Sequence, residues 1–372
     1  MLKVRTVGGP GVGAVLAAIV LAACGTAVPT ASNPQVSPAA RSPQASPAPV
    51  DVRLVIADYL GSEVRLASLD ARDTASTKGS YDGMAGGQVI VLDGTSLKAL
   101  NHGGAVTKLG QLAGAPSWTG PGTVTVKPDL SQWIYTLYGD DFVSRIHLGS
   151  AAGDKVIATI PPPEDGSFYR PFAWNAGGIY MVRQATGLGG AHPFLEYHFP
   201  LAKIDLASGR VTEVSPACWA YGVLDDGTML CGQPGQGQME IRSASGQSSV
   251  IRLTKTANET NYDSSYMAVV MSADNKRLIA ARNGAGGPVV NYQMAAADLT
   301  ASSASAFGPL DFVPETWLPD GRVVAYHQCL TGAGWGGGPC DTKLDGTYFF
   351  SADGLSHTLF YKGVHGQVVA WV

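Results

Sequence analysis

Two histidines and a glutamate lie close together in one segment of the chain, at His192, Glu196 and His198. Imidazole and carboxylate side chains are the groups that proteins use to bind metal ions and to transfer protons. Such a site requires convergence, and His192 and His198 point to the same side only where the segment is extended. These three residues are therefore candidate ligand residues in a loop, and a solvated loop without a site is the alternative.

A tryptophan in a glycine-rich segment is a fourth candidate ligand residue. Trp335 lies within Gly332–Gly337, which has the G-x-G-x-x-G spacing of dinucleotide-binding turns. No helical pattern follows this segment, so dinucleotide binding is not expected. An exposed Trp335 would stack on a sugar or contact a partner, and a packed anchor for the loop is the alternative. The sequence predicts no cofactor and no metal site.

Catalytic motifs and nucleic-acid contacts are both absent from the sequence. The G-x-S-x-G, H-E-x-x-H and phosphate-loop patterns do not occur. Asp140-Asp141 and Glu164-Asp165 are carboxylate pairs, but sequence neighbours rarely provide the fixed separation that glycoside hydrolysis requires. The Asp225–Gly227 turn is a weak calcium candidate, because most such turns hold no ion. The net charge is −4 and there is no basic run, so nucleic acid is not an expected partner.

A repeated pattern indicates the elements that must position these residues. In Glu315–Gln328, an apolar segment is followed by the turn dipeptide Asp320-Gly321 and the apolar run Val323–Tyr326. An unbroken apolar run is typical of a strand covered on both faces. Variants of this hairpin recur along the chain, with turns near residues 84, 129, 176, 226, 274 and 320.

These turns are 45 to 50 residues apart, and the segments between them show strand patterns. Such a repeat is typical of propeller blades, and a sandwich with coincidental turns is the alternative. The first folded segment, Val52–Asp70, lacks a first strand, and His365–Val372 lacks what should follow. Joining them completes one blade from both termini. We therefore predict an all-β fold over residues 51–372, a single propeller of seven blades, with six blades as the alternative if the loose copy near residue 84 is not a blade.

Four cysteines of the predicted propeller, Cys218, Cys231, Cys329 and Cys340, allow three pairings into two disulfides. We favour Cys218–Cys231, which flank one predicted hairpin, and Cys329–Cys340, which close a glycine-rich insertion. The other pairings would link blades that are not neighbours. A metal site is the alternative, but the spacings differ from Cys-x-x-Cys.

Residues 1–50 have the composition of a targeting segment followed by a tether. Lys3 and Arg5 precede the apolar run Val12–Ala23, which is short for a membrane-spanning helix. The run ends in Leu-Ala-Ala before Cys24, which resembles the lipobox of bacterial lipoproteins. That resemblance implies cleavage after residue 23 and a thioether-linked diacylglycerol on Cys24, and an ordinary secretory signal is the alternative. Residues 24–50 are rich in Pro, Ala and Ser, which predicts a disordered tether.

The repeat also resembles a known group of propellers. A strand ending in Asp before a Gly-containing turn, as in Leu201–Val214 (LAKIDLASGRVTEV), together with the recurring hairpin, is similar to TolB-like and WD40-like repeats. The resemblance covers most of residues 51–372 and implies a binding platform, while the fold alone implies no chemistry. The chain has no room for the separate N-terminal α/β domain of TolB, so a role in the Tol–Pal envelope system is not implied.

Two functions are compatible with these features. The first is a lipid-anchored protein on the extracytoplasmic side of the cell membrane, whose monomeric propeller binds or scaffolds a protein or envelope ligand. The second is a propeller enzyme of the glycoside hydrolase or lyase type, acting on extracellular or cell-wall glycans. We expect the first, because the tether, the lipid anchor and the ring fold are accompanied by no catalytic motif.

Overall fold

The structure is a computed structural model that describes residues 51–58, 61–116, 122–139, 141–164, 166–184, 199–232, 238–252, 267–283, 292–327, 341–362 and 366–372. Within these ranges, the single 3₁₀ turn Thr342–Leu344 is the only helix, and every other element is a β-strand. None of the helical structure found there is long and apolar enough to cross a lipid bilayer. The all-β fold that the sequence predicts is confirmed.

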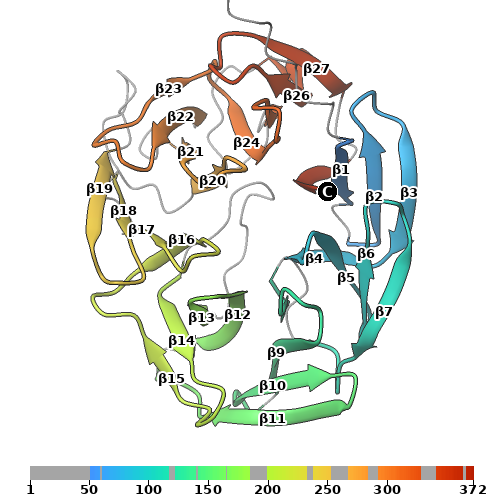
Figure 1. Ribbon diagram of the computed structural model, residues 1–372, viewed down its shortest axis with the longest axis vertical. Coiled ribbons are helices and arrows are strands. Elements are labelled where there is room, and N and C mark those ends of the chain that lie inside the picture. The colour runs from blue at the N-terminus through green and yellow to red at the C-terminus, as the bar shows by residue number, and fades with distance from the viewer. Residues whose placement is uncertain are drawn as a thin grey trace, which may run out of the picture. The chain divides into compact units, whose positions relative to one another are not determined.

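Seven antiparallel sheets of four strands follow one another around a ring (Figure 1). Each sheet is one blade, so the seven-bladed propeller is confirmed and the six-bladed alternative is wrong. In each blade the first strand lies nearest the centre of the ring. Blade 2 consists of β4 Ser80–Ala85, β5 Gln88–Asp93, β6 Ser96–Leu100 and β7 Val106–Gln111. Blade 3 consists of β8 Val124–Val126, β9 Gln132–Tyr138, β10 Ser144–Ser150 and β11 Gly153–Ile160. Blade 4 consists of β12 Phe168–Asn175, β13 Gly178–Gln184, β14 Leu201–Ile204 and β15 Val211–Glu213. Blade 5 consists of β16 Trp219–Val223, β17 Met229–Gly232, β18 Gln238–Arg242 and β19 Ser248–Arg252. Blade 6 consists of β20 Met267–Met271, β21 Arg277–Asn283, β22 Tyr292–Asp298 and β23 Ser305–Phe307. Blade 7 consists of β24 Phe312–Trp317, β25 Val323–His327, β26 Gly346–Phe350 and β27 His357–Lys362.

Blade 1 is assembled from the two ends of the propeller. Its order from the centre is β28 (Gln367–Trp371), β1 (Arg53–Ala57), β2 (Glu63–Ser68) and β3 (Asp73–Lys78). β28 pairs antiparallel with β1, and Arg53 and Val372 exchange backbone hydrogen bonds of 3.0 and 2.9 Å. The predicted closure by the N- and C-terminal strands is confirmed.

The repeated hairpin has the conformation that its sequence predicts. All five residues of β25, which follows the turn, are buried. In the turn, Gly321 has a φ of 89°, and Asp320 Oδ1 accepts a hydrogen bond from the backbone N–H of Arg322 at 3.0 Å. The aspartate fixes the turn and the glycine takes a left-handed conformation, which explains why this dipeptide recurs in the chain.

The first turn of blade 2 lies later than the sequence predicts. We expected it near residue 84, whereas β4 continues to Ala85 and the turn comprises residues 86 and 87. Asp82 and Gly83 are common turn residues, but here they lie inside β4 at a β-bulge. Because β4 contains an aspartate and a glycine, it lacks the apolar pattern of the other repeats. This explains why the segment near residue 84 matches the repeated hairpin only weakly.

The core lies between the blades. Seven clusters of buried apolar side chains each combine residues of two adjacent blades. In the cluster between blades 2 and 3, a Cβ atom at Gly110 or Gly149 would lie only 2.2 or 2.1 Å from the indole of Trp133. Glycine is therefore required at both positions, because the ring packs directly on their backbone. Apolar burial between neighbouring sheets holds the ring together.

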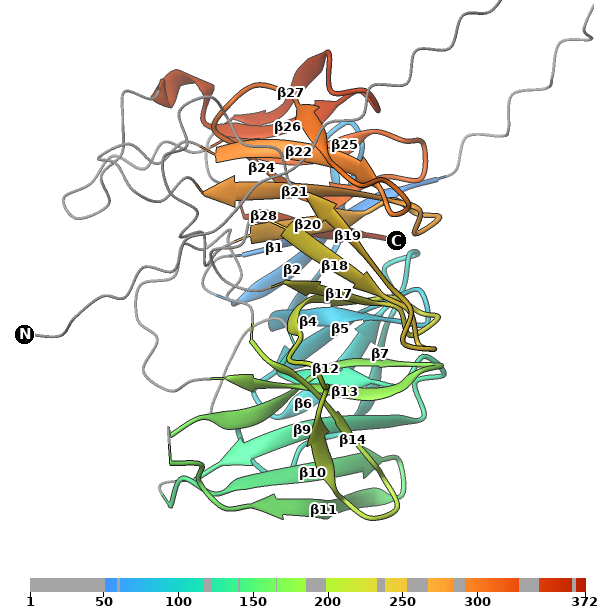
Figure 2. The same cartoon turned by 90° about the vertical axis from the view of Figure 1, so that its left-hand side faces the viewer.

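The two rims of the ring differ in the length of their connections. At one, the short-connection rim, two to six residues join the first strand to the second in blades 2 to 7, and the third strand to the fourth in all seven blades. At the other, the long-connection rim, the connections include residues 112–123, 185–200, 253–266 and 328–345. β1 starts and β28 ends at the short-connection rim, so Asp51 and Val372 lie there (Figure 2).

Candidate functional site

The ligand residues predicted from sequence belong to connections at the long-connection rim. His192, Glu196 and His198 lie between β13 and β14, and Trp335 lies between β25 and β26. All four fall outside the described residues, as do Cys24, Cys329 and Cys340. The strand order establishes that both connections join strand ends at the same rim. The roles of these residues stay predictions.

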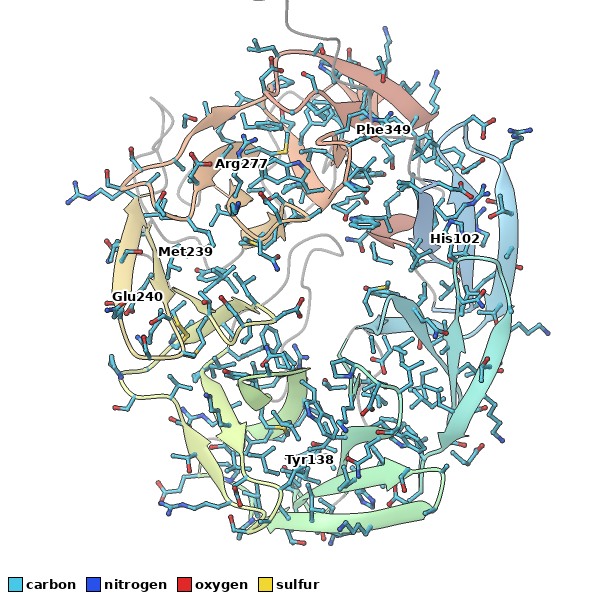
Figure 3. The ribbon with its side chains drawn as sticks, in the orientation of Figure 1. His102, Tyr138, Met239, Glu240, Arg277 and Phe349 are labelled. Atoms are coloured by element: carbon cyan, nitrogen blue, oxygen red, sulfur yellow. A yellow bond between two sulfur atoms is a disulfide. The ribbon has the colours of Figure 1, made fainter. Side chains whose placement is uncertain are left out.

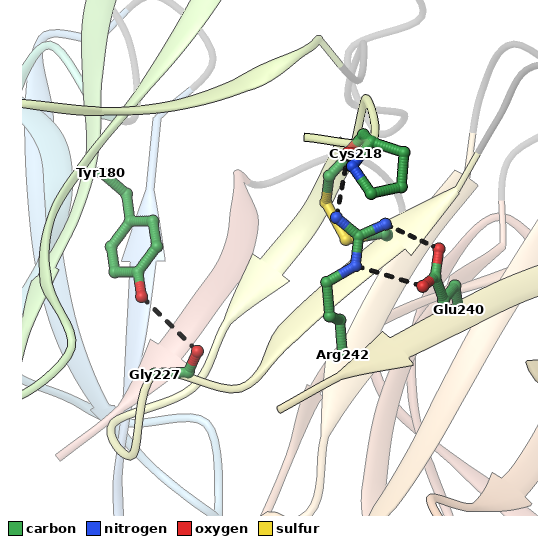
Figure 4. Close-up of a disulfide and its surroundings, with 7 residues drawn as sticks. Tyr180, Cys218, Gly227, Glu240 and Arg242 are labelled. Carbon is green, nitrogen blue, oxygen red and sulfur yellow. Dashed lines mark hydrogen bonds and ion pairs between the residues drawn. A yellow bond between two sulfur atoms is a disulfide. The ribbon is translucent and has the colours of Figure 1, made fainter. Parts of the chain in front are cut away.

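Cys218 and Cys231 form a disulfide bond, with 4.9 Å between their Cα atoms. It is the first of the two pairs that the sequence favours. Cys218 precedes β16 and Cys231 lies on β17, and both are buried between blades 4 and 5. Figure 4 shows the bond beside Arg242, which is held by Glu240 and by the carbonyl of Pro216. The bond therefore fixes the start of the innermost strand of blade 5.

Loss of this disulfide should destabilise the propeller. The double variant Cys218→Ala, Cys231→Ala removes a cross-link over 13 residues and leaves a gap in the core between blades 4 and 5. We expect the free energy of unfolding to fall by about 2–5 kcal/mol in urea denaturation. Wild-type protein unfolded with a reductant should lose a similar amount, and unchanged midpoints in both experiments would contradict a structural role.

Five of the seven innermost strands contain a β-bulge. At each bulge one residue has no partner on the second strand, and a bulge re-aims the side chain of that extra residue. The bulged residues are Asp82, Phe172, Tyr221, Glu315 and Val369. Two of the five are carboxylic acids, and both are buried.

Asp82 joins blade 2 to blade 3. Its side chain accepts hydrogen bonds from the backbone N–H groups of Thr123 (2.6 Å) and Val124 (2.8 Å), where β8 begins. Burial raises the pKa of Asp82 to about 8, although these donors and the charge of Arg170 act in the opposite direction. Arg170 Nε donates to Gln184 Oε1 at 2.6 Å. Asp82 of blade 2 thus interacts with backbone N–H groups at the start of blade 3 and with the charge of Arg170 in blade 4.

Glu315 occupies the corresponding bulge of blade 7. Its Oε1 accepts a hydrogen bond from the backbone N–H of Val368 in β28 at 3.3 Å, and its buried Oε2 has no hydrogen-bond partner among the described residues. Burial raises the pKa of Glu315 well above its ordinary value. Asp82 and Glu315 therefore bind the innermost strand of the next blade around the ring. Buried carboxyl groups held in this way position blades and are shielded from a ligand in solution.

An aromatic cluster at the long-connection rim is the best candidate binding surface among the described residues. We call Tyr138, Phe142 and Phe168 the rim cluster. Phe142 is 56% exposed, its ring lies edge-on to Tyr138 with centroids 5.7 Å apart, and Tyr138 lies 5.0 Å from Phe168. Tyr138 ends β9 and Phe168 begins β12, so the cluster connects blades 3 and 4 (Figure 3).

The backbone holds Phe142 outward in an unfavourable conformation. Its φ is 58°, a left-handed value that is costly for a large side chain and that is often retained at functional sites. The turn is fixed by Asp141, which accepts hydrogen bonds from the Val143 N–H (3.1 Å) and from two Arg145 nitrogens. The Arg145 hydrogen bond lowers the pKa of Asp141 to about 2, so the ion pair persists at neutral pH. A rigid, exposed aromatic ring binds a partner with little loss of side-chain entropy.

A histidine of blade 3 that the sequence did not single out forms a buried polar group. His147 Nδ1 lies 2.6 Å from Asp154 Oδ1, and the Tyr135 hydroxyl donates to Asp154 Oδ2 at 2.5 Å. An Asp–His pair is the arrangement of a general base. His147 is only 6% exposed, however, and it stacks on Tyr135 with centroids 4.8 Å apart. A substrate in solution does not reach it, so the group serves to join β9, β10 and β11.

Neither metal binding nor calcium binding finds support in the described ranges. No group of three or more His, Cys, Asp and Glu side chains within them is arranged to hold a metal ion. At the Asp225–Gly227 turn, Asp226 Oδ1 accepts a hydrogen bond from the backbone N–H of Thr228 at 2.8 Å. This aspartate therefore has the same turn-fixing role as Asp320.

The sequence reasoning missed the rim cluster and the two inner-strand carboxyls. For Asp82 and Glu315, a carboxylate inside the first strand of the blade, a few residues before the turn, was available as a signal. For the rim cluster, the Asp-Asp-Phe sequence at residues 140–142 places an aromatic residue in a polar turn, which is a weaker signal.

Comparison with known proteins finds likenesses among solved structures alone. No family model and no curated protein sequence matches the chain. Among solved structures, virginiamycin B lyase from Staphylococcus aureus is 14% identical, with 73% of this chain and 87% of that chain covered and a TM-score of 0.43. Oligogalacturonate lyase in complex with manganese is 14% identical, with 84% and 78% covered and a TM-score of 0.45. A protein described as TolB from Agrobacterium tumefaciens is 13% identical, with 86% and 91% covered and a TM-score of 0.37. At these identities the likeness concerns the propeller fold alone.

Proposed function

We propose that the chain is a monomeric, lipid-anchored binding module on the extracytoplasmic side of the cell membrane, and that its long-connection rim binds a protein or an envelope glycan. The observation that carries the proposal is the asymmetry of the two rims. The chain enters the propeller at the short-connection rim. The long connections and the exposed Phe142 belong to the opposite rim. The chain thus enters the propeller at one rim while the long connections belong to the other, and binding residues typically lie on such loops.

The anchor is tested by the Cys24→Ser variant of the full chain. The sequence before Cys24 supports lipid attachment at its thiol, and serine offers no thiol for this linkage. We expect wild-type protein to sediment with membranes and to incorporate labelled fatty acid, and the variant to lose both properties. Ser32→Ala in the tether is the control and should behave like wild type. A Cys24→Ser protein that stays labelled and membrane-bound would overturn the lipid attachment.

The binding surface is tested by crosslinking from each rim. A photo-crosslinking amino acid at position 142 of the full chain, in intact cells, should capture a protein or glycan. The same amino acid at position 355 is the matched control, because Leu355 is 86% exposed in a turn of the short-connection rim. In a pull-down of the captured partner with the full chain, we further expect Phe142→Ala to weaken binding by about tenfold, since exposed aromatic anchors contribute much of the binding energy. Equal capture from both positions, or none from either, would contradict the proposal.

A further inference from the structure

A cavity lies between blades 4 and 5 on the side of the short-connection rim. Its volume is about 290 Å³, near the lower end of the range for small-molecule sites. Blade 4 contributes residues of β14 and the segment 212–215, and blade 5 contributes the end of β18 and the turn 243–246. The cavity is remote from the rim cluster, which lies between blades 3 and 4 at the other rim.

The cavity contains a lysine whose charge no described carboxylate balances. Lys203 Nζ lies 4.7 Å from the ring centroid of Tyr180 and 3.4 Å from the carbonyl oxygen of Gly177. The second contact is long, so at least two of its three N–H groups remain available. No ion pair links Lys203 to any carboxylate in the part of the chain that the structure describes. The Tyr180 ring restricts the ammonium group, which reduces the entropy that a ligand would have to remove.

The other charges at the cavity are already paired. Glu213 on β15 forms an ion pair with Arg183 (3.2 Å) on β13, across β14, so it does not neutralise Lys203. Arg242 is 5% exposed and uses three N–H groups on Glu240 and on the Pro216 carbonyl (Figure 4). Its guanidinium carries five N–H groups, so two remain. The cavity is therefore lined by one unbalanced ammonium group and by the buried guanidinium of Arg242.

Small polar and apolar residues complete the lining. They are Thr212, Val214, Ser215, Met229 and Ser243. The Ser243 hydroxyl is already hydrogen-bonded to Ser245 and to the backbone N–H of Gln247. Ammonium and guanidinium groups are the groups that recognise a carboxylate or phosphate oxyanion, and Lys203 and Arg242 both line this cavity. The apolar part of the lining suits a small organic body attached to that oxyanion.

We propose that this cavity binds a small organic phosphate ester, with Lys203 as its principal ligand residue. The same chemistry is offered by a free phosphate ester and by the headgroup of an anionic phospholipid. The proposal is independent of the partner bound at the long-connection rim, because it concerns other residues on the opposite side of the ring.

The test measures binding of glycerol 3-phosphate and inorganic phosphate to the full-length Cys24→Ser protein at constant ionic strength. Calorimetry and thermal unfolding should both detect binding, since a ligand that binds only the folded state raises the unfolding temperature. Lys203→Met keeps the apolar stem of the side chain and should weaken binding at least tenfold, without changing the unfolding temperature in the absence of anion. Lys276→Met, at an exposed lysine in a turn of the same rim in blade 6, is the matched control and should bind as wild type does.

Vesicles distinguish the two sources of the oxyanion. Lys203-dependent binding to phosphatidylglycerol vesicles, but not to phosphatidylcholine vesicles, would identify a lipid headgroup. Lys203-dependent binding of the soluble ester alone would identify a free metabolite. Lack of binding to any probe by the wild-type protein, or equal binding by the Lys203→Met protein, would overturn the proposal.

Discussion

A chain that ends at Lys362, and therefore lacks β28, should fail to form a stable propeller. Loss of β28 would expose Leu54 and Ile56 of β1, which are 0% and 1% exposed in the closed ring. It would also remove the hydrogen bonds from Trp371 Nε1 to the Trp317 carbonyl and from the Val368 N–H to Glu315. Several buried side chains and a whole strand pairing together exceed the roughly 5–15 kcal/mol by which a domain is stable.

The measurement is urea denaturation followed by tryptophan fluorescence. We expect the truncated chain to show no cooperative transition, or a midpoint far below that of wild type. A synthetic peptide of residues 366–372 added in trans should restore part of the transition, because it supplies the missing strand, and a peptide of scrambled order should not. A truncated chain with a wild-type midpoint would show that the pairing of β28 with β1 does not close the ring.

Substitution of Asp82 should produce the largest effect of any single side chain described here. Asp82→Ala leaves the backbone N–H groups of Thr123 and Val124 buried without their acceptor. An unsatisfied buried donor costs about 1–3 kcal/mol, so we expect a loss of about 2–6 kcal/mol for the pair. Asp82→Asn retains one acceptor oxygen and should lose less. The control is Asp93→Ala, since Asp93 is an exposed carboxylate on β5 of the same blade.

The same residue should make stability depend on pH. Burial raises the pKa of Asp82 to about 8, above its ordinary value of 3.8, and burial raises the pKa of Glu315 as well. Between these pKa values the folded state keeps a proton that the unfolded chain releases, so stability falls as the pH rises from about 4 towards 8. We expect a lower urea midpoint at pH 8 than at pH 5, with a smaller difference in Asp82→Asn and in Glu315→Gln. If the urea midpoints at pH 5 and pH 8 differ as much in both variants as in wild type, the pH dependence does not come from Asp82 and Glu315.

The architecture could be predicted from sequence because the blade turns combine several local rules. Asp320 and Gly321 each have a turn-forming role that is visible in the sequence, and the buried strand that follows is an unbroken apolar run. The spacing of such turns then determines the number of blades, and the incomplete first and last segments indicate how the ring closes. These features depend on residues that are near one another in the chain.

The candidate site could not be predicted in the same way, since its interactions link residues far apart in sequence. Asp82 acquires its role only when β8 lies beside β4, since its partners Thr123 and Val124 are 41 and 42 residues later in the chain. The pairing of Lys203 with Tyr180, and the neutralisation of Glu213 by Arg183, likewise depend on strand register within blade 4. Phe142 is exposed because its own backbone takes a left-handed conformation in the turn, and the sequence does not specify that conformation. Conversely, the histidines and the tryptophan chosen from sequence lie outside the described residues, and their roles stay predictions.

The blade shared by β1 and β28 also sets the order of events during biosynthesis. The first strand of the ring must wait for the last one, and this final contact closes a loop of about 300 residues, which makes it slow to form. If the chain crosses a membrane through a secretion pore from its N-terminus, the ring can close only after the C-terminal strand has emerged. Completion of export and completion of folding would then coincide, and a chain stalled in transit would present the uncovered edge of β1 to proteases and chaperones.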